Sequence, residues 1–303
     1  MILLVRSFIV ILILSSCLTG CGLIKECFNT PNADIEIVNV ISDPSLGAVQ
    51  GVVVRDGFVY AYGDKRSLWK HSGVIREYTT DLKYTGRMVK LTKNGIAIIT
   101  HPTGLTWNKQ WGTFIGNTVK RKGTIFRIDW PQAWKESNLD NAVLNIIDDD
   151  AASDGSRPAF VNVGEESFIA SADYRVDNPE LRLYNITAML SAGRTASEGV
   201  ISHKIKCGRY TQNLYWDSEK GYLTFVQNMS LFGGLHLETI NLSKAITEGT
   251  TISPSVKISS FDFSERGELE GWYPLSGNVS LFAVNNKKQN LFSGMIKIKE
   301  SYR

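Results

Sequence analysis

The stretch "VQGVVVRDGFVYAYGD", residues 49–64, alternates apolar and polar side chains, turns at Asp56-Gly57, and alternates again. This pattern predicts a β-hairpin, because Asp-Gly between two alternating runs is a strong short-range turn signal. Four later stretches align beneath it and predict the same strand–turn–strand unit, with a second strand that ends near Asp or Asn. They are "TGLTWNKQWGTFIGNT" (103–118), "RPAFVNVGEESFIASAD" (157–173), "QNLYWDSEKGYLTFVQN" (212–228) and "EGWYPLSGNVSLFAVNN" (270–286).

The five hairpins recur at a nearly constant interval. They begin at residues 50, 103, 157, 212 and 270, which are 53, 54, 55 and 58 residues apart. Two more strand-like runs follow each of the first four hairpins, such as "GVIREYTTDL" (73–82) and "TGRMVKLT" (85–92) after the first. Inserts such as "PQAWKESNLDN" (131–141) between third and fourth strands are expected to hold a helical turn. Four strands per unit of roughly 40 to 60 residues is typical of a propeller blade. The sequence therefore predicts an all-β fold, a five-bladed β-propeller with four-stranded blades.

The fifth unit lacks a fourth strand, because only a few residues follow "NLFSGMIKI" (290–298). Near the other end, "ADIEIVNV" (33–40) has the pattern of an outer strand but precedes the first hairpin. We expect residues 34–40 to close the last blade, which covers its exposed edge and ties the two ends together. A β-sandwich also contains many short strands. It predicts neither the even interval nor the matching defects at the two ends.

The N-terminal stretch "MILLVRSFIVILILSSCLTGC" (1–21) carries one charge, Arg6, in an apolar run typical of a secretory signal. Its end, Leu18-Thr19-Gly20-Cys21, resembles the lipobox of bacterial lipoproteins. The resemblance implies cleavage before Cys21 and acylation of that cysteine, so that the chain is anchored to a membrane through lipid.

The same resemblance divides the chain into a signal peptide at 1–20, a lipidated tether at 21–32 and a single propeller domain at 33–303. It also implies a place in the bacterial cell envelope. Gly22 is not the aspartate that retains many such lipoproteins in the inner membrane, so the outer membrane is the expected location.

Composition limits the partners and cofactors. The net charge is +3 with no basic run, so nucleic acid is not an expected partner. With four histidines and no CxxC, the chain has no zinc-site spacing. Once Cys17 is removed with the signal and Cys21 is acylated, Cys27 and Cys207 remain as a pair available for a disulfide in an oxidising periplasm.

The blade pattern also locates a candidate site. The first strand of a blade lines the channel and the second pairs antiparallel to it, so the start of the first and the end of the second lie on one face. The first predicted ring comprises Gln50, Thr103, Arg157, Gln212 and Glu270. The second comprises Asp64, Asn117, Asp173, Asn228 and Asn286. Loops leading into the first strands add His101, Asp154, Asn213 and Glu268. A polar concavity on rigid strands is the expected binding site of such a fold.

Some of these residues have a structural alternative. Asp and Asn at strand ends also cap turns, and that interpretation is favoured for Asp64, Asn117 and Asn286. A charge at the channel mouth needs a partner or water, so Arg157 and Glu270 either meet a ligand or pair with each other or with Asp173.

The stretch "GELEG" (267–271) places Glu268 and Glu270 two residues apart. On an extended strand both side chains face one way, so one of the two is expected to titrate high.

Two enzymatic functions are open. Five-bladed propellers of furanosidase-like families hydrolyse glycosides with two carboxylates from different inner strands, but Glu270 is the one acidic residue of the first ring. The set of Asn117, Asp173, Asn228 and Glu270 is similar in type to the ligands of regucalcin- and paraoxonase-like propellers. That resemblance implies a lactonase or esterase with Ca²⁺ as cofactor, since oxygen ligands suit calcium.

The preferred hypothesis is a lipid-anchored binding protein that takes a small ligand, or a protein or saccharide partner, at the channel mouth. The sequence shows no Ser-His-Asp grouping, P-loop or glycine-rich nucleotide motif. Its catalytic residues, if any, are not identified by pattern.

Overall fold

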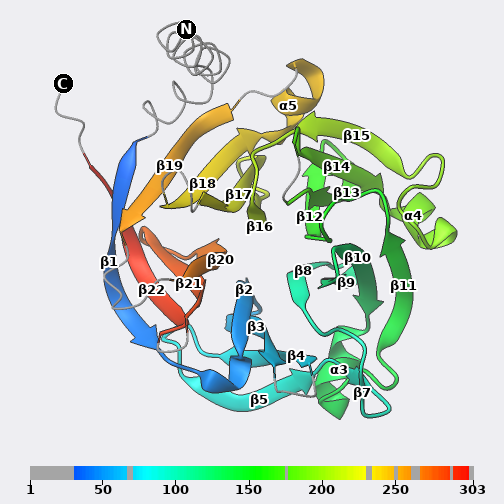
Figure 1. Ribbon diagram of the computed structural model, residues 1–303, viewed down its shortest axis with the longest axis horizontal. Helices are drawn as coiled ribbons and strands as arrows, with labels where there is room; N and C mark the ends of the chain where they lie inside the picture. The colour runs from blue at the N-terminus through cyan, green and yellow to red at the C-terminus, as the bar shows by residue number, and fades with distance from the viewer. Residues whose placement is uncertain are drawn as a thin grey trace, which may run out of the picture.

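The computed structural model describes residues 31–66, 71–174, 177–229, 234–248, 252–260, 267–286 and 289–299. Its strands form five four-stranded blades around a central axis (Figure 1), which confirms the predicted five-bladed β-propeller. The predicted signal peptide, Cys21 and Cys27 lie outside the described residues, as does all but the end of the predicted tether.

The strands follow one another from the axis outward within each blade. Blade 1 contains β2 (Ala48–Arg55), β3 (Phe58–Arg66), β4 (His71–Tyr78) and β5 (Tyr84–Lys90). Blade 2 contains β8 (Pro102–Asn108), β9 (Gly112–Val119), β10 (Lys122–Ile128) and β11 (Val143–Asp149). Blade 3 contains β12 (Ala159–Val163), β13 (Glu166–Ala172), β14 (Glu180–Asn185) and β15 (Ile201–Lys206). Blade 4 contains β16 (Thr211–Asp217), β17 (Tyr222–Met229), β18 (Gly234–Asn241) and β19 (Ile252–Ser260). Blade 5 contains β20 (Glu268–Pro274), β21 (Val279–Asn285), β22 (Leu291–Ile298) and β1 (Asn32–Ile41).

Short helices lie between third and fourth strands, where the sequence predicts helical turns. They are α3 (Trp130–Glu136), α4 (Ile186–Ala192) and α5 (Leu242–Glu248). Asp129 caps α3 by accepting the backbone N–H of Gln132 at 3.0 Å. A short hairpin, β6 (Thr92–Lys93) with β7 (Ile96–Ala97), connects blades 1 and 2. No helix in the described part of the chain is long and apolar enough to cross a membrane.

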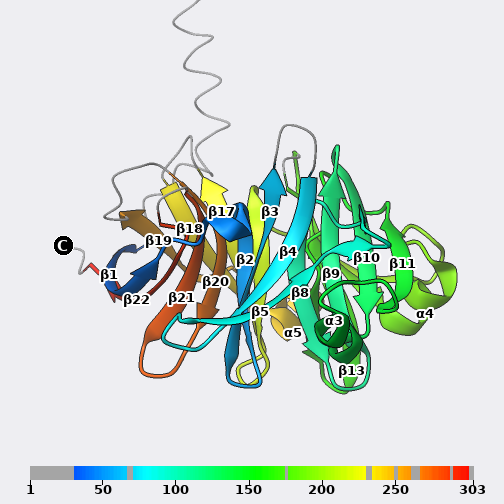
Figure 2. The ribbon, with the colours of Figure 1, turned by 90° about the horizontal axis from the view of Figure 1, so that it is seen from below.

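The N-terminal strand closes the last blade, as predicted. β1 pairs antiparallel with β22 from Ala33 opposite Ile298 to Ile41 opposite Leu291, and the two strands lie side by side at the rim in both views (Figures 1 and 2). The start of β1 also pairs in parallel with β19, at Asn32 opposite Lys257. This parallel contact, which the sequence pattern did not predict, joins blades 4 and 5 into one eight-stranded sheet.

The chain that leaves β1 is fastened to two blades by Asp43, just before the 3₁₀ turn η1 (Pro44–Leu46). The backbone N–H of Asp43 donates to Asn290 Oδ1 at 2.9 Å, and Asn290 Nδ2 donates to the Asp43 carbonyl at 2.8 Å. The Arg76 guanidinium and the Tyr78 hydroxyl donate to the Asp43 carboxylate. This buried network, here called the clasp, ties blade 5 to blade 1.

The core lies between blades, where the faces of neighbouring sheets pack together. Between blades 2 and 3, for example, Phe114 and Ile125 pack with Phe160 and Ile169. Because neighbouring blades cover both faces of each sheet, the middle strands are mostly apolar, as in "FIASA" (168–172).

Candidate functional site

The start of the inner strand carries the same irregularity in four of the five blades. One extra residue interrupts the pairing with the second strand and forms a β-bulge, a device that re-aims a side chain. The bulged residues are Gln50, Thr103, Gln212 and Glu270. In blade 3 the corresponding residue is Arg157, which precedes Pro158 and the start of β12 at Ala159. The residues predicted as the first ring therefore occupy equivalent positions, one per blade.

Most of these side chains are buried. Arg157 is 5% exposed and Glu270 2% exposed, and Gln50 and Thr103 are buried as well. Gln212 remains partly exposed, with its Nε2 3.5 Å from the Tyr174 hydroxyl. Thr103 is engaged inside the protein, because its hydroxyl donates to the Ser156 carbonyl.

One residue beyond the ring, Asn213 links three blades near the axis, and its contacts with Tyr62 and the Glu270 carbonyl are here called the floor. The sequence placed Asn213 and Glu268 in loops leading into the inner strands, which is wrong: Asn213 lies within β16 and Glu268 begins β20. The side-chain amide of Asn213 donates to the Tyr62 hydroxyl at 2.6 Å and to the Glu270 carbonyl at 3.2 Å. These bonds join blades 4, 1 and 5 beneath the ring.

Glycine at position 51 permits this floor. A Cβ on Gly51 would lie 2.1 Å from Tyr62 Oη and 2.5 Å from Asn213 Nδ2. A Cβ on Gly271 would lie 2.8 Å from the Cα of Gly51. The inner strands of blades 1, 4 and 5 thus approach one another more closely than any side chain at these positions would allow.

The second predicted ring mainly holds the loops that lead into the inner strands. Asn117 Oδ1 accepts the backbone N–H groups of Thr100 at 3.1 Å and His101 at 3.0 Å. Asn228 Oδ1 accepts the N–H of Leu269 at 2.9 Å. These contacts match the capping interpretation of strand-end Asn residues. Asn286 is buried at the equivalent position.

Asp173 is saturated by donors. Its carboxylate accepts the backbone N–H groups of Ser153 at 2.7 Å and Glu180 at 2.9 Å, and it pairs with Arg182 at 2.6 Å. Asp173 therefore balances the charge of Arg182, and the predicted alternative in which it pairs with Arg157 is not what the structure shows.

The residues suggested as calcium ligands are not brought together as a metal site. The side-chain oxygens of Asn117, Asp173 and Asn228 each accept protein N–H groups, and two N–H donors of Arg182 face Asp173. A cation needs free oxygen ligands, so this donor-filled set does not fit Ca²⁺. The described residues contain no group of three or more His, Cys, Asp or Glu side chains arranged to hold a metal ion.

Asp64 and His101 form a pair at the mouth. His101 Nδ1 lies 2.8 Å from Asp64 Oδ2, with the histidine side chain 28% exposed and the aspartate buried. Because Asn117 fixes the backbone on which His101 stands, the imidazole is held from two directions. The pair connects blade 1 to blade 2 and holds an imidazole at the rim of the channel.

Arg157 is a buried cation with few contacts. Its Nη1 donates to the Asp154 carbonyl at 3.2 Å, and its Cζ lies 4.6 Å from the ring centroid of Tyr174. Among the described residues no carboxylate forms an ion pair with it, and its buried Nε has no hydrogen-bond partner. Burial lowers the pKa of Arg157 to about 10, so it remains charged at neutral pH.

Glu270 is a buried acid beside a second carboxyl group. Burial raises the pKa of Glu270 well above its ordinary value, and the neighbouring Glu268 charge and a hydrogen bond to Glu268 raise it further. The direction of this shift agrees with the expectation that one member of "GELEG" titrates high. Glu268 itself is exposed at the rim.

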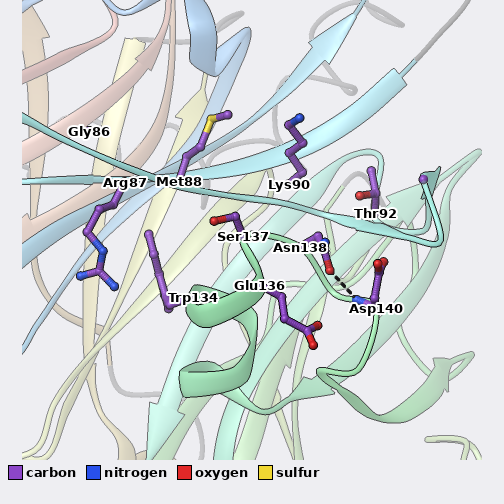
Figure 3. Close-up of a pocket in the computed structure, with 11 residues that line it drawn as sticks. Gly86, Arg87, Met88, Lys90, Thr92, Trp134, Glu136, Ser137, Asn138 and Asp140 are labelled. Atoms are coloured by element: carbon purple, nitrogen blue, oxygen red, sulfur yellow. Dashed lines mark hydrogen bonds between the residues drawn. The ribbon is translucent and has the colours of Figure 1, made fainter.

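A separate hollow of about 600 Å³ lies at the outer edge of the molecule, between β5 and the segment that follows α3 (Figure 3). Three of the charged groups there have partners within the protein, Lys90 being the fourth: Arg87 pairs with Glu77 at 3.1 Å, and Glu136 accepts from Gln132 at 2.6 Å. Asp140 accepts a backbone N–H at 2.7 Å. None of the sequence-predicted site residues lines this hollow.

Cys207 is a free, half-buried thiol. Burial raises the pKa of Cys207, so the thiol stays protonated at neutral pH. Its suggested disulfide partner, Cys27, is outside the described residues.

Two tyrosines at the channel were not predicted. Tyr62 lies inside β3 and looks like a core position in the alternating pattern, and Tyr174 follows the second strand of blade 3. The signal that would have found them is their place beside Asp64 and Asp173 in the second ring. Tyr62 stands two residues before Asp64, and Tyr174 directly follows Asp173.

No protein-family model and no curated protein sequence matches the chain. Its fold is similar to that of solved structures at low sequence identity. Glutaminyl cyclase from Myxococcus xanthus aligns with a TM-score of 0.58 and 10% identity over 90% of this chain and 100% of that one. A luciferin-regenerating enzyme aligns with a TM-score of 0.51 and 11% identity over 88% and 97%. An exo-β-1,3-galactanase from Clostridium thermocellum aligns with a TM-score of 0.51 and 11% identity over 86% of this chain and 61% of that one. At these identities the comparisons establish the propeller fold alone.

Proposed function

We propose that this chain is a lipid-anchored, extracytoplasmic β-propeller that binds a small ligand at the mouth of its central channel. The observation that carries the proposal is Arg157, a buried guanidinium with no ion-pair partner among the described residues. A buried charge without a counter-ion is costly, and a ligand with an anionic group would supply that counter-ion. Perturbed titratable groups clustered on rigid strands also favour a functional site.

The geometry favours a small ligand over a protein or saccharide partner. Four of the five first-ring residues are buried, and the described mouth residues that reach solvent are His101, Asp154, Gln212 and Glu268. So few exposed side chains offer little area for a large partner, since stable protein interfaces bury about 800 Å² per partner.

The enzymatic alternatives have weaker support. A glycosidase needs two available carboxyl groups from different blades. Of the acids that could act with Glu270, Asp173 pairs with Arg182 at 2.6 Å and Asp154 pairs with Arg121 at 3.3 Å. A calcium-dependent hydrolase would require free oxygen ligands, and those of Asn117, Asp173 and Asn228 accept protein donors. The similar solved structures include enzymes, but their names do not transfer at this identity.

The binding proposal is tested by thermal melting of the full-length chain in detergent with a panel of small organic ions. A ligand that binds the folded state raises the melting temperature with the logarithm of its concentration. We expect a rise that is lost in Arg157→Met and retained in Arg194→Met, a matched change at an exposed arginine on the far side of blade 3. An undiminished rise in Arg157→Met would overturn the proposal.

The lipid anchor is tested separately by mass spectrometry of the protein isolated from bacterial membranes. The lipobox-like Leu18-Thr19-Gly20-Cys21 supports an acylated N-terminal cysteine. A mature chain that begins at Cys21 and carries acyl mass is expected, whereas an unmodified Cys21 in the membrane fraction would contradict the anchor.

A further inference from the structure

The channel mouth holds a guanidinium and two carboxyl groups that form no ion pair with each other. Arg157 forms no ion pair with the carboxylates of the described residues, and neither Glu268 nor Glu270 forms one with their cations. Glu270 and Arg157 are nevertheless close enough to influence each other's charge. The mouth thus presents a buried guanidinium from blade 3 and two carboxyl groups from blade 5 that form no ion pair with it.

The other carboxylates nearby already have partners within the protein. Asp173 pairs with Arg182 at 2.6 Å, and Asp154 pairs with Arg121 at 3.3 Å. Asp64 contacts His101 at 2.8 Å. The unbalanced groups are therefore Arg157 and the Glu268–Glu270 pair, one buried and the other reaching from the interior to the rim.

We infer that the ligand is a small zwitterion of the amino-acid class, whose carboxylate binds Arg157 and whose ammonium group binds the Glu268–Glu270 pair. This inference rests on the proposed function of the channel mouth. The unpartnered Nε of Arg157 supplies a donor for the carboxylate, and Tyr174 covers one face of the guanidinium. A simple anion would leave the acid pair unmatched, and a simple amine would leave Arg157 unmatched.

Binding of the ammonium group has a defined proton balance. Burial and the neighbouring Glu268 charge raise the pKa of Glu270, which favours its protonated form in the free protein. The ammonium group, with its own three N–H donors, takes the place of the Glu270 proton, which leaves for solvent as Glu270 becomes a carboxylate. The other charged groups that act on Glu270 are Arg157, which favours its ionisation, and Asp64, which opposes it. His101 Nδ1 lies 2.8 Å from Asp64 Oδ2.

The experiment is isothermal titration of the full-length chain, in detergent, in two buffers that differ in ionisation enthalpy. The probes are the common protein amino acids, β-alanine and 4-aminobutyrate, with acetate and methylamine as single-charge comparisons. We expect at least one amino acid to bind about tenfold or more tighter than either comparison. Its binding should release up to about one proton near neutral pH.

Two variants test the binding of the ammonium group and of the carboxylate separately. Glu270→Gln is expected to abolish proton release and to weaken amino acids while leaving acetate binding intact. Arg157→Met is expected to abolish binding of acetate and of amino acids. Glu166→Gln, at an exposed hairpin position of blade 3, is the matched control and should behave like the native chain.

The outcomes distinguish this inference from the proposed function. If acetate binds as tightly as every amino acid and Arg157→Met abolishes that binding, the zwitterion is wrong and the channel-mouth site stands. If amino acids bind without proton release, the acid pair is not their partner and the inference falls. If no probe binds, or if Arg157→Met binds them all like the native chain, the inference and the proposed function both fall.

Discussion

The side-chain amide of Asn213 donates a hydrogen bond of 2.6 Å to the hydroxyl of Tyr62, across the propeller axis from blade 4 to blade 1. Both side chains are buried, and Asn213 also donates to the backbone of blade 5. These hydrogen bonds therefore join blades 4, 1 and 5 at the centre of the propeller, next to the ring that contains Arg157 and Glu270.

Removing one hydroxyl tests that floor. Tyr62→Phe deletes the acceptor at 2.6 Å and leaves a buried amide with one longer bond to the Glu270 carbonyl. We expect the free energy of unfolding to fall by about 1 to 3 kcal/mol, measured by urea denaturation. Tyr222→Phe, whose hydroxyl makes no hydrogen bond among the described residues, should change it by less than about 0.5 kcal/mol. Equal effects of the two variants would show that the Tyr62 hydroxyl contributes nothing to the floor.

If the clasp holds the propeller closed, its removal should open the structure locally where blade 5 meets blade 1. Asn290→Ala removes both hydrogen bonds to Asp43, which join blade 5 to the chain leaving β1. We expect a loss of about 1 to 3 kcal/mol and faster amide hydrogen exchange in β1 and β22 than in blades 2 and 3.

The matched control for the clasp is Asn39→Ala in β1, where the side chain makes an exposed hydrogen bond to the Asp81 carbonyl. Its cost should stay below about 0.5 kcal/mol. Uniform protection of all blades in Asn290→Ala would contradict the clasp.

Arg157 is expected to reduce the stability of the ligand-free protein. Because the guanidinium is buried without an ion-pair partner among the described residues, Arg157→Met should raise the free energy of unfolding by about 1 kcal/mol. Urea denaturation without ligand measures the change, with Arg194→Met as the exposed control. A clear destabilisation would show that Arg157 is a structural residue and would count against a site held ready for a ligand.

Glu270 predicts how stability varies with pH. Its pKa is raised above the ordinary 4.5, so the folded state binds its proton more tightly than the unfolded state does. This contribution is fully present below the unfolded pKa and is lost as the pH rises through the folded pKa. Thermal melting between about pH 5 and about pH 8 should therefore show a smaller loss in Glu270→Gln than in the native chain. Glu166→Gln should follow the native profile, and identical profiles for all three proteins would contradict the raised pKa.

Calcium is expected to leave the melting temperature unchanged. The carboxylate of Asp173 faces Arg182 and backbone donors, which leaves it no free lone pair suited to a cation. Melting with millimolar calcium and with chelator should give the same curve. A calcium-dependent rise that disappears in Asp173→Asn would restore the metallohydrolase hypothesis.

The architecture was predictable because it repeats. A hairpin such as residues 49–64 is ambiguous alone, but the near-constant interval between five copies requires a radial array, and one missing strand requires residues 34–40 to close it. The first ring was predictable for the same reason, since Gln50, Thr103, Gln212 and Glu270 keep one position relative to the turn.

The partners of these residues were not predictable. Whether Arg157 meets a carboxylate depends on distances between blades that no local pattern records, and Asp173 is balanced instead by Arg182, nine residues away in the next strand. Asn213 belongs to the strand although it was assigned to a loop, since β16 begins at Thr211, one residue before the aligned hairpin. The parallel contact of β1 with β19 also escaped prediction, since it depends on how far blade 4 leans toward blade 5.

A crystal structure of the chain soaked with millimolar amino acid tests the central claim most directly. The account predicts electron density for a carboxylate within about 3 Å of the Arg157 guanidinium, with an ammonium group beside Glu270. Density in the hollow next to Trp134 instead, or a collapsed Arg157–Glu270 ion pair with no ligand between them, would contradict it.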